Sequence, residues 1–212
     1  QPVHEEMTIR ARACAQWAAD LSGPLNCVAM PATTAGSPQG NKYDSLVRGV
    51  WWNDDPNQLL FALRQARWIF QIKRGENLSK KDWGQPRAQA RIHSGYFMNY
   101  RSHYGDLQFL HAMASEKDEP AATTRQNILA WAEFAYAVGT GKIGAERKLQ
   151  QVEINHFQLH FHRQPGWNVA YLFGPKYFLG DGHFRNMALG SLLHVIQDSY
   201  SEAHVDRNFD AT

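Results

Sequence analysis

A histidine and an aspartate near the end of the chain have the spacing of a metal-binding pair. His194 and Asp198 are four residues apart, and His204 follows six residues later. On a helix, residues four apart lie on the same face, so an imidazole and a carboxylate there can bind one divalent cation together. The residues around His194 are largely apolar, and polar groups in an apolar helix need a partner. The pattern favours a metal site over a core histidine beside a surface ion pair.

His204 does not share that helix face. It lies ten residues after His194, which is roughly 80° away around a regular helix. We therefore expect His204 to bind a neighbouring metal, or to be turned back toward the pair by a helix end near Ser201.

Composition is that of an ordinary globular protein with one unusual feature. The 212 residues are 43% hydrophobic and 20% charged, which fits a single packed domain over residues 1–212. The net charge is only +2, so no strong basic surface for duplex nucleic acid is expected. No apolar run approaches the roughly 20 residues that span a bilayer. Histidine is the unusual feature: there are ten, and neutral imidazole is the commonest metal ligand.

The spacing of apolar residues predicts a mostly helical chain. Helices are expected over residues 4–21, 57–73, 104–115, 120–138 and 184–200. Polar or irregular segments are expected over residues 30–48, 74–92 and 166–182, and residues 145–163 could be helical at first and then extended. The fold class is therefore all-α, a single multi-helix domain with long loops.

The string from Leu189 to His204, LGSLLHVIQDSYSEAH, resembles the metal-binding helix of the zinc-dependent phospholipase C and single-strand-specific nuclease superfamily. The resemblance covers about sixteen residues. It implies an all-helical fold of the phospholipase C type that hydrolyses phosphodiesters with zinc ions. It also implies that His194 and Asp198 bind one zinc, that Asp198 bridges to a second, and that His204 binds a third.

The resemblance assigns a role to His4 near the start of the chain. His4 is similar to a first-helix histidine that binds zinc together with the amine and carbonyl of the terminal residue. Gln1 stands where that family has tryptophan, so amine ligation does not follow. The alternative is a solvated histidine at a helix start.

Asp54 and Asp55 are adjacent carboxylates that follow Trp51 and Trp52. Burying them is costly unless a cation neutralises them. The resemblance implies a zinc-binding aspartate at this point in the sequence. Asp54 matches that aspartate slightly better than Asp55 does. Asp54 or Asp55 could then orient a metal-bound water and take its proton. The alternative is a helix cap before Pro56.

The resemblance also requires one histidine between these aspartates and the helix at 120–138. His93, His103 and His111 are available. His111 fits best because it lies in an apolar segment just before that helix. His156, His160 and His162 are expected in exposed or core-capping positions.

Members of the superfamily carry a further histidine and acidic residue downstream of the residue that His204 resembles. No histidine follows His204 before the sequence ends at Thr212. We expect either a chain cut before those residues or an incomplete third site, so that two zinc ions are held more securely than three.

The expected function is phosphodiester hydrolysis by metal-activated water, most simply as a phospholipase C that touches membrane surfaces transiently. An aromatic segment could meet lipid or a choline-like head group; it includes Trp167, Tyr171, Phe173, Tyr177 and Phe178. The same rings could stack single-stranded nucleic acid, as in a nuclease, or could simply pack in the core. An alternative of another class is a non-catalytic lipid- or partner-binding module with a degenerate metal site.

The resemblance implies a secreted or periplasmic protein. Cys14 and Cys27 permit an oxidising compartment, where they could form one disulfide, but they could also remain buried thiols.

Overall fold

The structure is a computed structural model that describes residues 3–19, 44–60, 64–79, 98–161, 166–174 and 181–205. Helices provide the regular structure of these residues, and no strand occurs among them. The nearest approach to a sheet in the described ranges is an isolated antiparallel bridge between Lys148 and Asn168. The predicted all-α class is confirmed.

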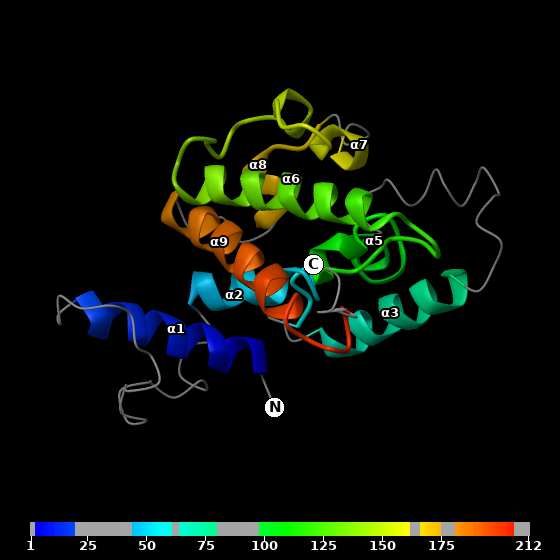
Figure 1. The fold of residues 1–212 in the computed structure, drawn as a ribbon, viewed down its shortest axis with the longest axis horizontal. Helices are drawn as coiled ribbons and strands as arrows, with labels where there is room; N and C mark the ends of the chain where they lie inside the picture. The colour runs from blue at the N-terminus through cyan, green and yellow to red at the C-terminus, as the bar shows by residue number, and fades with distance from the viewer. Residues whose placement is uncertain are drawn as a thin grey trace, which may run out of the picture.

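Helix α9 (Asp181–Asp198) lies between two other helices and carries both His194 and Asp198. Helix α6 (Ala121–Gly139) packs along one side of α9, and helix α2 (Ser45–Trp52) packs along the other (Figure 1). Helix α1 (Val3–Ala19) lies outside α2 and also touches α9. The first turn of α1, which carries His4, lies close to the C-terminal end of α9, which carries Asp198.

Helices α2 and α9 approach closely because each has a glycine at the crossing. A Cβ atom on Gly190 would lie 2.2 Å from the carbonyl oxygen of Leu46, and one on Gly49 would lie 2.3 Å from that of Met187. Any side chain at either position would force the helices apart. The close crossing places the backbone of α2 within reach of side chains on α9.

Aromatic side chains fill the core on the α6 side of α9. The rings of Trp52 and Trp131 stack with centroids 5.4 Å apart, and Phe173 packs against both. The Trp52 indole also donates a hydrogen bond to the Leu172 carbonyl at 3.2 Å, so its polar atom is satisfied in the core. This packing fixes the end of α2, which is the start of the segment that holds Asp54 and Asp55.

The remaining helices pack around the core. Helix α3 packs on α5, and short helical turns lead into and out of α6. These elements are α3 (Gln65–Ser79), α5 (Met98–Tyr104), η4 (Gln108–His111), η5 (Leu149–Gln151), α7 (Phe157–Phe161) and α8 (Val169–Phe173).

A buried arginine ties α5 to α7. Arg101 is fully buried and makes two hydrogen bonds to the carboxylate of Asp106, at 2.8 and 2.7 Å. It also donates to the backbone oxygen of His160 at 2.6 Å, and the His160 ring approaches Asp106 at 3.1 Å. His160 thus belongs to a structural ion-pair cluster, whereas the sequence predicted an exposed or core-capping position for it.

Several predicted boundaries are wrong. Residues 45–48, expected in a loop, are helical because Asp44 accepts hydrogen bonds from the backbone N–H groups of Leu46 and Val47. The helix expected over 57–73 starts only at Gln65 and runs to Ser79, because residues 53–60 form turns. Residues 104–115 hold the end of α5 and the short helix η4, and residues 145–163 hold η5 and α7.

The segment 166–182, expected to be irregular, contains α8, whose first turn is capped by the Asn168 side chain. The helix expected over 120–138 is confirmed as α6, and the one over 184–200 as α9. None of the described helices is both long enough and apolar enough to cross a membrane. Cys14 is buried and disulfide-bonded; Cys27, the chain's other cysteine, lies outside the described residues.

Candidate metal centre

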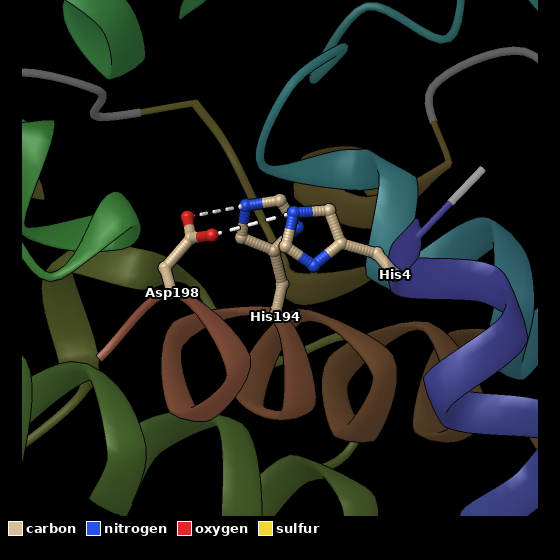
Figure 2. A group of neighbouring side chains, drawn as sticks. All are labelled: His4, His194 and Asp198. Carbon is tan, nitrogen blue, oxygen red and sulfur yellow. Dashed lines mark ion pairs between the residues drawn. The ribbon is translucent and has the colours of Figure 1, made fainter. Parts of the chain in front are cut away.

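Helix α9 brings His194 and Asp198 together as their spacing predicts. The Nε2 atom of His194 lies 2.9 Å from Oδ2 of Asp198, and both side chains are buried. Figure 2 shows both side chains rising from α9, with His4 reaching toward them from α1. The rings of His4 and His194 stack with centroids 4.3 Å apart.

The close crossing of α2 and α9 determines which nitrogen of His194 carries hydrogen. His194 Nδ1 lies 2.7 Å from the carbonyl oxygen of Val50. A carbonyl oxygen only accepts hydrogen bonds, so Nδ1 must donate. In the neutral ring Nε2 then carries a lone pair directed at Asp198. This arrangement is typical of metal-binding histidines, which donate their other N–H to a backbone carbonyl or carboxylate.

His111 meets the same carboxylate from a different part of the chain. Its Nδ1 atom lies 3.0 Å from Asp198 Oδ2 and 3.0 Å from His194 Nε2. Zinc holds imidazole nitrogens at about 2.0–2.1 Å, which separates tetrahedral ligand atoms by about 3.3 Å. The triangle formed by His111, His194 and Asp198 would need to widen by only a few tenths of an ångström to hold zinc.

A buried asparagine holds the three contributing segments in place. Asn53 donates to the backbone oxygens of Leu110 at 2.7 Å and Ser191 at 3.3 Å. Its Oδ1 accepts a hydrogen bond of 2.6 Å from the Ser191 hydroxyl, which in turn accepts from Trp131 at 3.1 Å. Asn53 therefore connects the residues next to Asp54 and His111 with the helix that carries His194.

His4 is held in a fixed tautomer by Gln197 and Thr8. The Thr8 hydroxyl donates to the backbone oxygen of His4 at 2.8 Å, so it accepts from Gln197 Nε2 at 2.9 Å. This leaves Gln197 Oε1 facing His4 Nδ1 at 2.8 Å, and that nitrogen must donate. The lone pair of His4 Nε2 is then directed at Asp198 Oδ1, 3.3 Å away.

His204 returns to the cluster through a turn after α9. The helix ends at Asp198, and the backbone N–H of His204 donates to the carbonyl of Ser201 at 3.0 Å. Its Nε2 atom comes 3.6 Å from Asp198 Oδ1. The end of α9 near Ser201 therefore turns His204 back toward Asp198, which is one of the two placements that the sequence predicted.

Asp54 and Asp55 separate into different environments. Asp54 lies 4.0 Å from His111 Nδ1 and from His194 Nδ1, and its side chain is 42% exposed. Asp55 is buried and accepts a hydrogen bond from the backbone N–H of Leu60 at 2.7 Å. Burial raises the pKa of Asp55 to about 6. Asp54 thus faces the cluster of His111, His194 and Asp198, whereas Asp55 caps the turn that follows α2.

Asp198 is a buried carboxylate whose neighbours are imidazoles. Burial opposes ionisation of Asp198, but the adjacent imidazoles of His111 and His194 outweigh it and hold the pKa of this carboxyl well below its usual range. Neutral His111 can donate from Nδ1 to Asp198, since its Nε2 has no hydrogen-bond partner among the described residues. Neutral His194 instead directs the lone pair of Nε2 at Asp198, because its Nδ1 donates to Val50. A cation between His194 and Asp198 would remove this repulsion.

A divalent cation could be bound by His111, His194 and Asp198 together, since their facing atoms lie 2.9–3.0 Å apart. Imidazole nitrogens and carboxylate oxygens without thiolates form a donor set that suits zinc. The described side chains contain two groups with ligand atoms close enough for a shared ion: His4, His194 and Asp198, and Asp54, His111 and His194. The residues present therefore fit a bound metal.

His103 is part of the surroundings, although His111 makes the contacts expected of the ligand. The His103 ring lies 5.3 Å from the His111 ring, and its Nδ1 donates to the Asn99 carbonyl at 2.9 Å. Burial, together with His111 and His194, lowers the pKa of His103 to about 4. The third alternative, His93, and also His162 lie outside the described residues. His156 lies between η5 and α7.

Sequence reasoning missed the residues that orient the ligands. Gln197 and Asn53 are uncharged amides in a helix and at a helix end, and nothing in their sequence context separates them from ordinary surface amides. Glu5 was missed too: it is buried beside His4, and its electrostatic neighbours include His4 and Asp54. A carboxylate directly after a candidate ligand was the only signal available for it.

No protein-family model matches the chain, and no curated protein and no solved structure matches it significantly.

Proposed function

We propose that the protein is a zinc-dependent hydrolase that cleaves phosphodiester bonds with metal-activated water, on a fold of the zinc-dependent phospholipase C type. One observation carries the proposal: His194 and His111 direct nitrogen atoms at a single buried carboxylate oxygen of Asp198, at 2.9 and 3.0 Å. The resemblance around His194 supports zinc and phosphodiester chemistry over other metal-dependent reactions.

Each residue has a role that follows from its position. His111, His194 and Asp198 would hold the zinc ion, and Val50 O would orient His194. Bound zinc supplies Lewis-acid stabilisation of a phosphate oxygen and makes an adjacent water easier to ionise. Asp54 is near the metal ligands but half exposed, so it can contact both a water and a substrate. It would orient that water and accept its proton.

Phospholipid is the preferred substrate class, with transient membrane-surface contact. Val3 and Met7 flank His4 on α1 and are exposed, and Tyr200 follows Asp198 by two residues and is 75% exposed. These apolar side chains suit the rim of a site that meets lipid. Phe173, by contrast, is fully buried in the core, so it does not contribute to such a surface. Tyr171 is exposed and packs edge-on against Trp167.

Two alternatives follow from other readings of the same features. A single-strand-specific nuclease would use the same metal chemistry, with Tyr200 or Tyr171 stacking on bases. A non-catalytic lipid- or partner-binding module would keep the fold and bind metal weakly. Export to the periplasm or outside the cell belongs to the same proposal, and the disulfide at Cys14 supports it.

The proposal is tested by removing and restoring the metal. Dialysis against EDTA should abolish cleavage of phosphatidylcholine, and zinc should restore it; single-stranded DNA is assayed in parallel. His194→Asn should be inactive. The matched control is His156→Asn, because His156 has a φ of 66° that asparagine tolerates well. Cleavage that survives metal removal would overturn the hydrolase proposal, and cleavage of DNA alone would favour the nuclease.

A further inference from the structure

Helix α3 lies at the edge of the described fold and packs against it with one face (Figure 1). The indole of Trp68 donates to the backbone oxygen of Asp54 at 3.3 Å. The Gln71 side chain accepts hydrogen bonds from Asn57 at 3.2 Å and from Asn99 at 2.9 Å. These bonds fix the inner face of α3 to the segment that carries Asp54 and to α5.

The opposite face of α3 exposes apolar side chains. Phe70 follows Trp68 by two residues, which places it about 160° around the helix from the inner face. Phe70 is 59% exposed, and Ile69 beside it is 38% exposed. Surface helices normally direct such side chains toward the core. The described part of the chain therefore leaves apolar area on α3 uncovered.

Basic side chains surround Phe70 on this face. Arg67, Lys73 and Arg74 are each three or four residues from Phe70. Residues at these spacings are neighbours on a helix surface, within about 60° of one another around the axis. Arg67 and Lys73 are exposed, and Arg74 is half-buried. The aromatic ring thus lies among three cations.

Positive charge is concentrated in this part of the chain. Residues 56–75 contain four Lys or Arg and no Asp or Glu, whereas the whole chain has 22 basic and 20 acidic residues. None of the ion pairs between described residues uses Arg67, Lys73 or Arg74. The charge of α3 is therefore complementary to an anionic partner outside the chain.

We propose that the outer face of α3, formed by Arg67, Ile69, Phe70, Lys73 and Arg74, docks the protein on bilayers that contain anionic phospholipids. Phe70 enters the boundary between head groups and acyl chains, and the basic side chains around it bind the head groups. Single-stranded nucleic acid also binds basic and aromatic side chains. The bilayer is favoured because Ile69 extends the apolar area and offers no ring for stacking on a base.

This docking deepens the proposed function, on which its role in catalysis rests, by naming the surface and the lipid charge. Trp68 joins α3 to the backbone of Asp54. A docked α3 would therefore hold the residues around Asp54 at a fixed position relative to the lipid surface.

Vesicle binding tests the inference without any need for catalysis. The full chain is sedimented with vesicles of phosphatidylcholine alone and with vesicles of equal parts of phosphatidylcholine and phosphatidylserine. Zinc-loaded and EDTA-treated protein are both measured, so that hydrolysis of lipid does not affect the second measurement. Wild type should bind the phosphatidylserine vesicles more tightly, and added salt should weaken this binding.

Variants on the outer face of α3 should weaken binding to the phosphatidylserine vesicles. Each cation near an anionic surface strengthens binding about fivefold, so Lys73→Gln combined with Arg74→Gln should weaken it roughly 25-fold. Phe70→Ala should weaken it about tenfold through lost apolar burial. Circular dichroism checks that both variants are folded.

Matched controls change the same charge and a similar ring elsewhere. Lys142→Gln combined with Arg147→Gln removes two exposed cations that follow α6. Tyr136→Ala removes a ring on α6 that is 54% exposed. Both controls should bind as wild type does. Equal losses in the controls and the α3 variants would overturn the inference, as would wild type that binds single-stranded DNA but no vesicle.

Hydrolysis of a soluble short-chain phosphatidylcholine separates this inference from the proposed function. Cleavage of that substrate without binding to phosphatidylserine vesicles overturns the docking surface and leaves the hydrolase standing. Vesicle binding that depends on Lys73, Arg74 and Phe70, without cleavage of any phosphodiester, supports the docking surface and overturns the hydrolase.

Discussion

Gln197 offers a sharp test of whether His4 helps to bind the metal, because Gln197 orients His4 and belongs to neither group of candidate ligands. Its Oε1 accepts from His4 Nδ1 at 2.8 Å, and its Nε2 donates to the Thr8 hydroxyl at 2.9 Å. Gln197→Met keeps the length of the side chain but removes both bonds. His4 is then free to change tautomer and to rotate away from Asp198.

The expected effect on affinity follows from the usual cost of removing a residue that orients a metal ligand. Such changes weaken metal binding about 10- to 100-fold, which is about 1.4–2.7 kcal/mol. Gln197→Glu should retain most of the affinity, because a carboxylate still accepts the hydrogen of His4 Nδ1 although it cannot donate to Thr8. The contrast between these two variants isolates the orientation of His4 from general disturbance of the helix.

Isothermal titration of the metal-free protein with zinc, in competition with a chelator, measures the affinity. Zinc affinity should fall in Gln197→Met and should stay close to that of wild type in Gln197→Glu. Gln126→Met, at an exposed glutamine on α6, is the matched control. Equal zinc affinity in Gln197→Met and wild type, or equal losses in the Met and Glu variants, would refute the role given to Gln197.

Three further predictions concern stability. Gly190→Ala would place a Cβ atom 2.2 Å from the Leu46 carbonyl oxygen, so urea denaturation should show a loss of about 1–3 kcal/mol; an unchanged midpoint would contradict the close helix crossing. Asp106→Asn should cost about 3 kcal/mol by breaking the pair with buried Arg101. Burial opposes ionisation of Asp106, but the hydrogen bonds from Arg101 and His160 hold its pKa well below the usual range. Its stabilisation is therefore complete above the unfolded pKa of about 3.9 and is lost as pH falls below it; acid titrations of stability should be flatter in Asp106→Asn than in wild type. Zinc at about 100 times its dissociation constant should stabilise the protein by about 2.7 kcal/mol, a rise of about 5–10 °C in Tm for a chain of this size, and a similar rise in His194→Ala would show that the ion binds elsewhere.

The parts of the fold that local sequence determines were predictable. The spacing of His194 and Asp198 identified the face of α9 because helix geometry alone brings residues four apart together. Residues 120–138 were recognised because their apolar periodicity is long and ends at glycine. The short helix α2 was missed because eight residues carry little periodic signal, and its start depends on one capping side chain, Asp44.

Local sequence patterns could not predict that segments far apart in the chain come together at the site. The approach of His111 to Asp198 depends on the hydrogen bonds of Asn53 and on two glycines at a helix crossing. The choice among three histidines could be argued only from the apolar setting of His111. Likewise, only the structure separates Asp54, which faces the cluster, from Asp55, which caps a turn.

The central claim is that a metal ion lies between Asp198, His111 and His194. Crystals grown with zinc and measured on both sides of the zinc absorption edge test it most directly. The claim predicts an anomalous peak within bonding distance of Asp198 Oδ2, His111 Nδ1 and His194 Nε2. Crystals soaked in zinc that show no such peak, with the two imidazoles hydrogen-bonded directly to Asp198, would contradict it.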